Sequence, residues 1–334
     1  MNRDETILIG FLIFPGFPMA CLTSMIEPLR AANEISGKPA FGWRLLSEDG
    51  QRVEASAHVW FEPDLSLKDC DTVDQLFVLS GPSSHFTQRA ASEGKLRNLA
   101  RHGVALGAIS GGVFPLARSG LLEGHTTSVH WCYETAFAAE FPQLTATEDV
   151  IVIDRRRLTA SGAAAAFDLS LHLIEGSLGA DVATEVACWF QHPLVRGQGV
   201  MQRKPTFSAE STHDMLPIPI RHAVQIFGEN IEDPVKIANV ADQVGVSPRQ
   251  LERMFHKATG TTPLGYYRSL RMHKARQLLL YSKDSMIDIA LAVGYSSTAA
   301  LTKNYRDVFR VHPREDRNKI NMFRVRENTI IPSA

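Results

Sequence analysis

The chain has 334 residues, of which 44% are hydrophobic, so it can bury more than one core, and typical domain sizes predict two domains. Its net charge of −1 is unevenly distributed: residues 217–334 contain 18 Lys and Arg against 11 Asp and Glu, a net +7, which leaves −8 on residues 1–216. A basic C-terminal part on an acidic body is typical of a protein that binds nucleic acid, and on charge alone a solvated basic surface is the alternative.

The composition argues against a membrane, disulfide-rich or metal-binding protein. The most apolar early run, Ile7–Phe14, is too short to span a bilayer and follows the acidic pair Asp4-Glu5, unlike a signal peptide. No CxxC pair and no histidine at zinc spacing accompanies the four cysteines, which are Cys21, Cys70, Cys132 and Cys188. We therefore expect core thiols in a reducing cytoplasm, with no metal and no cofactor.

Apolar runs and amphipathic segments alternate through residues 1–191. The runs predict strands at Ile7–Phe14, Trp43–Leu46, Gln75–Leu79, Val104–Ile109, Ile151–Ile153 and Leu158–Ala160. Helices are predicted through Leu22–Ala32, at 92–102, from Gly111-Gly112 to Ala117, up to about Phe141, from the small-residue run 161–166 onward, and up to about Phe190. This alternation predicts an α/β domain with a parallel sheet.

Ser110 stands between a predicted strand and a predicted helix that begins near Gly111-Gly112. A residue in this position lies on a tight turn at the carboxyl end of a strand, beside helix amides that favour negative charge. The tract Ala108-Ile-Ser-Gly-Gly112 differs by one residue from the G-x-S-x-G pattern of a nucleophile elbow. The sequence therefore places a site at this turn.

Residues 1–191 resemble the ThiJ/PfpI domain, which is class I glutamine-amidotransferase-like. The likeness is carried by Phe14-Pro-Gly16, Glu27-Pro-Leu-Arg-Ala-Ala-Asn33, Ile109–Gly112, Leu116-Ala117, Gly120-Leu-Leu-Glu-Gly124, His130-Trp131 and Ala166-Phe-Asp-Leu-Ser-Leu-His-Leu173. It implies a flavodoxin-like sandwich, with the parallel sheet between helices.

The resemblance implies either an effector pocket or an enzyme at this turn. Enzymatic members generally carry a cysteine where Ser110 stands; a serine needs a dedicated base, for which His130 is the candidate, oriented by Glu27 or Asp168. This ThiJ/PfpI-type hydrolase or amidase, tethered to DNA, is the alternative. A nucleic-acid-dependent chaperone or a deglycase-like repair enzyme is indicated only by analogy with the superfamily.

We favour a non-catalytic pocket that binds a small amine or amino-acid-derived effector. Amides near Gly81 and Gly111 are expected to hold a carboxylate, as helix N-termini do. Trp131 or Trp60 would face a cationic nitrogen. The residues assigned to effector binding are Ser110, Glu27, Gly81, Gly111, His130 and Trp131, although core positions are open alternatives for His130 and Trp131. Asp168 is expected to cap or orient backbone.

Residues 192–216 lack a clear hydrophobic period and contain several Pro, Gly, Ser and Thr, which predicts an interdomain linker. Residues 217–319 are predicted to form a second, all-α domain. Residues 320–334 are predicted to be a poorly ordered polar tail.

The second domain contains one short pattern twice. Its copies are Ala241-Asp-Gln-Val-Gly-Val-Ser247, followed by Leu251 and Phe255, and Ala290-Leu-Ala-Val-Gly-Tyr-Ser296, followed by Leu301 and Tyr305. The alanines permit close helix crossing, the glycines permit the turn, and Ser247 and Ser296 or Ser297 cap the next helix. Each copy predicts a helix-turn-helix, and a helix at about 263–280 joins them.

Because Leu251, Phe255, Leu301 and Tyr305 are predicted to be buried, the side chains between them face outward and can enter a major groove. The residues assigned to DNA contact are Arg249, Gln250, Arg253, Ser297, Thr298, Ala299, Thr302 and Lys303. Two such helices would enter adjacent grooves about 34 Å apart.

The second domain resembles the DNA-binding domain of AraC-family bacterial regulators. The likeness is carried by Arg249-Gln-Leu-Glu-Arg-Met-Phe255, Pro263, Tyr266-Tyr-Arg-Ser-Leu-Arg271, Ala275-Arg-Gln-Leu-Leu279, Ile287, Ala290, Val293-Gly-Tyr295 and His312-Pro-Arg314. Two positions depart from it: Ala300-Leu301 replaces a frequent His-Phe pair, and Arg310 replaces a usual glycine.

A ThiJ/PfpI domain fused to an AraC-type domain resembles the GlxA-like subfamily, which includes regulators of arginine, carnitine and glycine-betaine catabolism. The resemblance implies a cytoplasmic homodimer that binds double-stranded operator DNA and a small-molecule effector, acts with RNA polymerase as an activator, and has no membrane partner.

Overall fold

The computed structural model describes residues 6–192, 196–202, 216–282 and 284–319. These residues form two compact units, which divide between Gln202 and Arg203. The predicted tail, 320–334, lies outside the described residues, as do 193–195 and 203–215 of the predicted linker.

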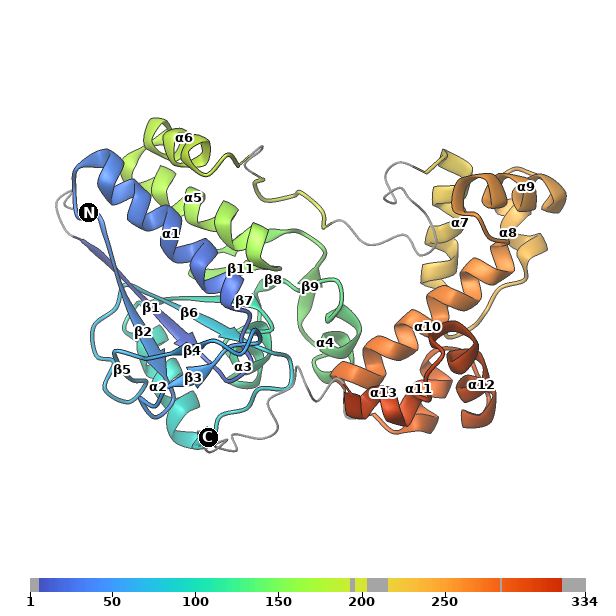
Figure 1. Cartoon of the computed structure of the whole chain (residues 1–334), viewed down its shortest axis with the longest axis horizontal. Helices are drawn as coiled ribbons and strands as arrows, with labels where there is room; N and C mark the ends of the chain where they lie inside the picture. The colour runs from blue at the N-terminus through green and yellow to red at the C-terminus, as the bar shows by residue number, and fades with distance from the viewer. Residues whose placement is uncertain (1–5, 193–195, 203–215, 283, 320–334) are drawn as a thin grey trace. The chain divides into compact units, whose positions relative to one another are not determined.

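The first unit is built on a seven-stranded sheet with the order β10-β11-β7-β6-β1-β2-β5 (Figure 1). Its strands are β1 Ile7–Ile13, β2 Phe41–Ser47, β5 Leu65–Ser66, β6 Gln75–Ser80, β7 Ala105–Ser110, β10 Ile151–Asp154 and β11 Arg157–Ala160. Every neighbouring pair is parallel except β10 and β11, which are antiparallel. The predicted parallel sheet is confirmed, with one antiparallel edge strand.

Two small sheets flank the main one and were not expected from the sequence. β3 Val53–Glu54 pairs antiparallel with β4 Trp60–Phe61, and β8 Thr126–Ser128 pairs parallel with β9 Thr145–Thr147. Strands of two or three residues are too short to show an alternating pattern, which explains why the sequence did not indicate them.

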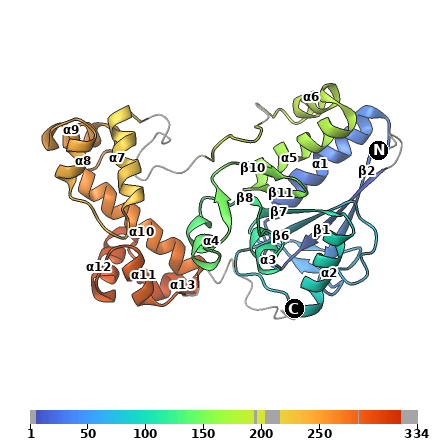
Figure 2. The same ribbon diagram turned by 180° about the vertical axis from the view of Figure 1, so that it is seen from behind.

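Helices cover both faces of the main sheet, as Figures 1 and 2 show, with α1, α5 and α6 on one face and α2 and α3 on the other. The helices of this unit are α1 Met19–Ser36, α2 Arg89–Arg101, α3 Val113–Arg118, α4 Glu134–Glu140, α5 Ala163–Leu178 and α6 Ala180–Trp189. Phe11 and Phe77 from neighbouring strands are fully buried, with ring centroids 6.0 Å apart. The predicted three-layer sandwich is thereby confirmed.

The prediction of four core thiols is wrong in part. Cys21 and Cys70 are buried, Cys132 is half-buried, and Cys188 is exposed. The helix α6 buries Ala183, Val186 and Ala187, and Cys188 lies just beyond this buried stripe. Among the described residues, no helix is long and apolar enough to cross a bilayer.

The second unit consists of helices packed around two cores that share α10. Its helices are α7 Ile218–Glu229, α8 Ile237–Gln243, α9 Pro248–Thr259, α10 Pro263–Tyr281, α11 Met286–Ala292, α12 Thr298–Phe309 and α13 Pro313–Lys319. The first core contains Phe227, Phe255 and Tyr267, and the second contains Leu301 and Tyr305. Each core holds one helix-turn-helix, as the duplicated pattern predicts.

Candidate DNA-binding and effector-binding sites

The first helix-turn-helix has the turn and cap that its sequence predicts. Gly245 adopts a φ of 73°, a conformation that favours glycine, between α8 and α9. Ser247 caps α9 by accepting from the backbone N–H of Gln250, while Oε1 of Gln250 accepts from the backbone N–H of Ser247 at 2.9 Å. Leu251 and Phe255 are fully buried, which orients the opposite face of α9 toward solvent.

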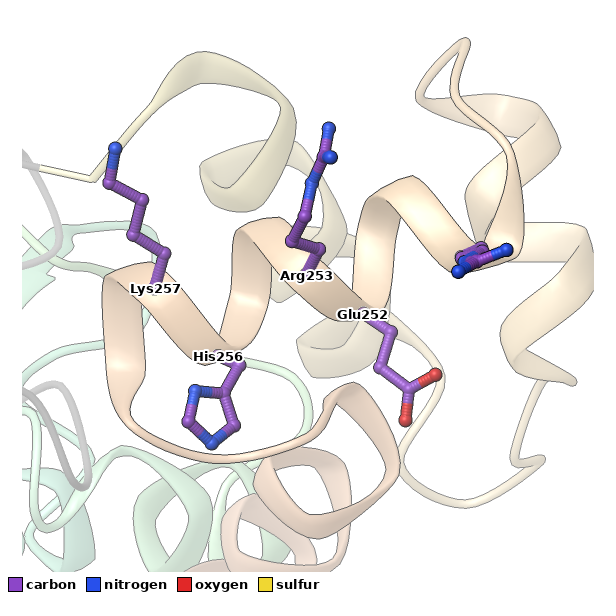
Figure 3. A pocket seen from close by; sticks show the side chains of 5 residues that line it. Glu252, Arg253, His256 and Lys257 are labelled. Atoms are coloured by element: carbon purple, nitrogen blue, oxygen red, sulfur yellow. The ribbon is translucent and has the colours of Figure 1, made fainter.

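Basic side chains gather on the exposed face of α9. Arg249, Arg253 and Lys257 lie four residues apart, and Figure 3 shows Arg253 and Lys257 extending from the same side of the helix. With Glu252 and His256 they line a shallow hollow of about 460 Å³. His256 and Lys257 are not among the residues predicted to contact DNA, although their i+3 and i+4 spacing from Arg253 is visible in the sequence.

Gln250 is exposed, but its side chain also completes the cap of α9. The sequence pattern Ser-x-x-Gln at 247–250 is the signature of this capping box. A contact between Gln250 and a base would therefore have to be made without the oxygen that binds Ser247, or at the expense of that hydrogen bond.

The second helix-turn-helix repeats this arrangement with a less basic helix. Gly294 adopts a φ of 72°, and the cap of α12 is Ser297, not Ser296, because Oγ of Ser297 accepts from the N–H of Ala300. Ala299 and Lys303 are exposed, whereas Ser297, Thr298 and Thr302 are half-buried. This helix presents small and hydroxyl side chains where α9 presents arginines.

Two features stabilise the end of the second helix-turn-helix. Arg310 ends α12 with a φ of 58°, the left-handed conformation that Gly260 adopts after α9 with a φ of 71°. The buried carboxylate of Asp316 accepts from the hydroxyl of Tyr305 at 2.6 Å and lies 2.8 Å from the guanidinium of Arg276. Burial and this carboxylate raise the pKa of Tyr305, so its hydroxyl remains a donor.

Ser110 lies on a strained turn at the carboxyl edge of the main sheet. It is buried and has a φ of 54°, a conformation that costs a non-glycine residue about 1–2 kcal/mol. A Cβ on Gly111 would lie 2.4 Å from the carbonyl oxygen of Ser80, and one on Gly112 would lie 1.9 Å from that of Val78. Only glycine fits at these positions, because β6 and the start of α3 approach so closely.

Several of the predicted effector residues lie at this same edge. Ser80, which precedes Gly81, is paired with Ser110 across β6 and β7. A Cβ on Gly162, which follows β11, would lie 3.3 Å from Cδ2 of His130, so His130 lies beside the end of β11. Since β11 pairs with β7, the sheet brings His130 to the edge where Ser110 and Gly111 lie.

The imidazole of His130 is oriented by its neighbour Cys132. Its Nδ1 accepts from the backbone N–H of Cys132 at 3.3 Å and lies 2.9 Å from the thiol sulfur. Burial lowers the pKa of His130 and raises that of Cys132 to about 12, so the ring is neutral and the thiol is protonated. An accepting Nδ1 places the ring proton on Nε2, which makes Nε2 a hydrogen-bond donor.

This tautomer does not suit the hydrolase alternative, since a general base needs a free lone pair directed at the nucleophile. Within residues 6–192, no hydrogen bond joins Ser110 to His130 or to Glu27. Glu27 is instead paired with Arg30 on α1, at 3.0 Å, with 46% of its side chain exposed. The structure therefore places Ser110, Gly81, Gly111 and His130 at one edge and gives Glu27 a partner of its own.

Asp168 has a role that the sequence indicated only in outline. Its fully buried carboxylate accepts from the backbone N–H of Arg196 at 3.1 Å, as expected of a residue that orients backbone. It also accepts from Nε of Arg196 and from Nε2 of His192, both at 2.8 Å. The start of the predicted linker is thus held on α5, through contacts 24 and 28 residues apart in sequence.

Comparisons with known proteins bear on both units. Residues 19–176 match the DJ-1/PfpI family, and residues 240–319 match a helix-turn-helix domain family. The chain is 35% identical over 309 residues to the HTH-type transcriptional regulator GbdR of Pseudomonas aeruginosa, covering 92% of this chain and 83% of that one. It is 34% identical over 331 residues to the regulator ArgR of the same species, covering 97% of each.

The chain belongs to the GlxA-like AraC-family transcriptional regulators. It is also 32% identical over 309 residues to GlxA of Rhizobium meliloti, covering 91% of this chain and 94% of that one. The crystal structure of an AraC-family regulator from Pseudomonas putida is 27% identical and covers 55% of this chain and 99% of that chain, with a TM-score of 0.50. This GlxA-like regulator therefore binds DNA to control transcription, and the prediction of a regulator that is not an enzyme is confirmed.

Proposed function

We propose that this regulator activates transcription in response to a small amine or amino-acid-derived metabolite, bound at the carboxyl edge of the main sheet. The observation that carries the proposal is the strained turn at Ser110, because strain of this kind persists where a site depends on it. The backbone amides near Gly81 and Gly111 would bind the ligand carboxylate, and Nε2–H of His130 would donate to it.

The proposed charge of the ligand rests on two further predicted residues, Glu27 on α1 and Trp131 next to His130. Glu27, with part of its side chain exposed, would exchange Arg30 for a ligand ammonium, and Trp131 would contact a quaternary nitrogen. A zwitterion with a carboxylate and a cationic nitrogen satisfies both halves of such a site.

The helical unit would read DNA through α9 and α12. Arg249, Gln250 and Arg253 would contact one part of the operator, and Ser297, Thr298, Ala299, Thr302 and Lys303 the next. A cytoplasmic homodimer would bring four such helices to two half-sites, and binding beside a promoter would allow contact with RNA polymerase. The effector would act by favouring one arrangement of the DNA-binding units.

A titration of the full-length protein with operator DNA tests the assignment of α9. Arg253→Ala should weaken binding by about 1–3 kcal/mol. If Arg253 contacts a phosphate, the slope of log K against log salt concentration should also become shallower by about one. Arg249→Ala should relax base preference. Arg101→Ala, which removes the same charge from an exposed position on α2, is the matched control. Unchanged affinity and base preference in both α9 variants would refute the assignment.

A thermal-shift screen tests the effector site with glycine betaine, L-carnitine, L-arginine and related amino acids. A ligand at a hundred times its dissociation constant should stabilise the α/β unit by about 2.7 kcal/mol. Glu27→Gln should abolish the shift, whereas Glu34→Gln, which also removes a partner of Arg30, should retain it. A shift that survives both Glu27→Gln and Ser110→Ala would place the ligand elsewhere.

A further inference from the structure

The turn of the second helix-turn-helix is packed more closely than the turn of the first. Gly245 and Gly294 adopt nearly the same φ, 73° and 72°. A Cβ on Gly245 would meet no atom of the described residues within 4 Å. A Cβ on Gly294 would lie 2.7 Å from the carbonyl oxygen of Glu232 and 2.8 Å from that of Ile231, in the connection between α7 and α8. The second turn therefore touches the first half of the helical unit, and only glycine permits this approach.

Arg271 of α10 binds this turn through two backbone carbonyls. Its Nε donates to the carbonyl of Val293 at 2.8 Å, and its Nη2 donates to that of Gly294 at 2.7 Å. The guanidinium also lies over the ring of Tyr295, 4.1 Å from the ring centroid. An arginine suits this arrangement because its planar fork offers two donors in a fixed geometry together with a flat face, whereas a lysine offers a single ammonium.

Tyr267, four residues earlier on α10, binds the connection between α7 and α8. Its hydroxyl donates to the carbonyl of Asn230 and accepts from the backbone N–H of Val235 at 3.4 Å. Since residues four apart share one face of a helix, Tyr267 and Arg271 bind the two segments that meet at Gly294. Figure 1 shows α7–α9 and α11–α13 at opposite ends of α10, so this junction is a second connection between the two halves, beside α10 itself.

We propose that Arg271 is the positioning residue that fixes the second helix-turn-helix relative to the first, and so limits the operator spacing that the protein accepts. The inference rests on the proposed DNA contacts of α9 and α12, because it assigns selectivity for spacing to the same two helices. The turn that Arg271 binds leads directly into α12, so a released turn would let α12 tilt relative to α9. Such a protein would fit several spacings, but it would bind the best one less tightly, because ordering the two halves would cost free energy on binding.

Binding of the full-length protein to two DNA fragments tests this inference. The first is a double-stranded fragment selected by repeated binding to the wild-type protein. The second carries one extra base pair between the two sequence elements of each half-site, which footprinting locates. One base pair moves an element by about 3.4 Å along the DNA axis and by about 35° around it. The wild type should therefore bind the second fragment about tenfold or more weakly.

Arg271→Met removes the two donors and keeps an unbranched side chain. It should bind the selected fragment about fivefold more weakly and should distinguish the two fragments by about threefold or less. Arg271→Lys keeps the charge without the planar fork, so it should distinguish them to an intermediate extent, and it provides the test if Arg271→Met does not fold. The ratio of the two affinities is the decisive measurement, because a general loss of stability would lower both affinities alike.

The matched control is Arg268→Met, which removes the same charge from an exposed position one turn earlier on α10 and should keep the wild-type ratio. A control that also loses the ratio would attribute the effect to charge alone and would overturn the inference.

The outcomes distinguish this inference from the proposed function. If the wild type itself tolerates the extra base pair, the proposed contacts of α12 are wrong and the inference fails with them. If the wild type distinguishes the two fragments and the folded Arg271 variants distinguish them equally well, Arg271 does not limit the spacing, although the proposed contacts stand.

Discussion

Replacing Asp168 by alanine should destabilise the α/β unit more than most single changes. The carboxylate is fully buried and accepts hydrogen bonds from the backbone and side chain of Arg196 and from His192. Removing one partner of a buried ion pair costs about 3–5 kcal/mol when the other charge remains buried. Here the Arg196 side chain is 30% exposed and can return to water, so we expect a loss of about 2–3 kcal/mol.

The chain offers a direct assay for this loss. All four tryptophans, Trp43, Trp60, Trp131 and Trp189, lie in the first unit, so tryptophan fluorescence during urea unfolding reports on that unit within the full-length protein. The midpoint should fall with no change in slope. In a double-mutant cycle, the variant that combines Asp168→Ala with Arg196→Ala should lose much less stability than the sum of the two single losses.

The matched control is Asp181→Ala, which removes an exposed carboxylate from the first turn of α6 and should cost less than about 0.5 kcal/mol. A loss below about 1 kcal/mol for Asp168→Ala, or additive effects of the two single changes, would refute the view that Asp168 anchors His192 and Arg196 on α5.

Three further changes have defined outcomes. Arg310→Gly should stabilise the helical unit by about 1 kcal/mol in thermal unfolding followed by circular dichroism, because glycine adopts its φ of 58° without strain; no gain would mean that Arg310 makes compensating contacts. Ser110→Gly should raise the fluorescence-detected stability by about 1 kcal/mol and abolish effector binding, and a less stable variant would argue against strain at the turn. Burial, with a smaller contribution from Arg276, lowers the pKa of His273 from 6.5 to about 4. The folded protein therefore loses stability as the pH falls from 6.5 to 4, by at most about 3 kcal/mol, because the buried ring resists the proton that the unfolded chain accepts. His273→Gln should reduce this acid sensitivity, and an identical pH profile of the variant would contradict the prediction.

The elements that the sequence predicted well are those with a local signal. The run Ile7–Phe14 indicated β1 because a strand buried on both faces is continuously apolar. Gly245 and Gly294 indicated the turns because few other residues adopt a φ near 72°. The buried positions of α9 and α12 followed from their four-residue spacing.

The contacts that the sequence could not indicate are those between distant residues. Nothing near Gln202 in the chain shows that it binds a loop 71 residues earlier, and a glutamine in a polar segment without hydrophobic period is typical of a linker. The pairing of Asp168 with Arg196 is hidden for the same reason. The sequence also does not show which neighbour on α1 pairs with Glu27; in the structure it is Arg30.

If α9 and α12 both contact the operator, as proposed, the sharing of α10 by both helical cores limits the operators that this regulator can recognise. The 19 residues of this helix form a rod about 28 Å long, and its two halves are each fixed by the packing of a different core. Inserting one residue in the middle of α10 would rotate one helix-turn-helix by about 100° relative to the other, so the two could no longer face adjacent grooves together. With the proposed contacts, the length of α10 would set the distance between the two sequence elements of a half-site, and only insertions that restore the helical phase would preserve recognition.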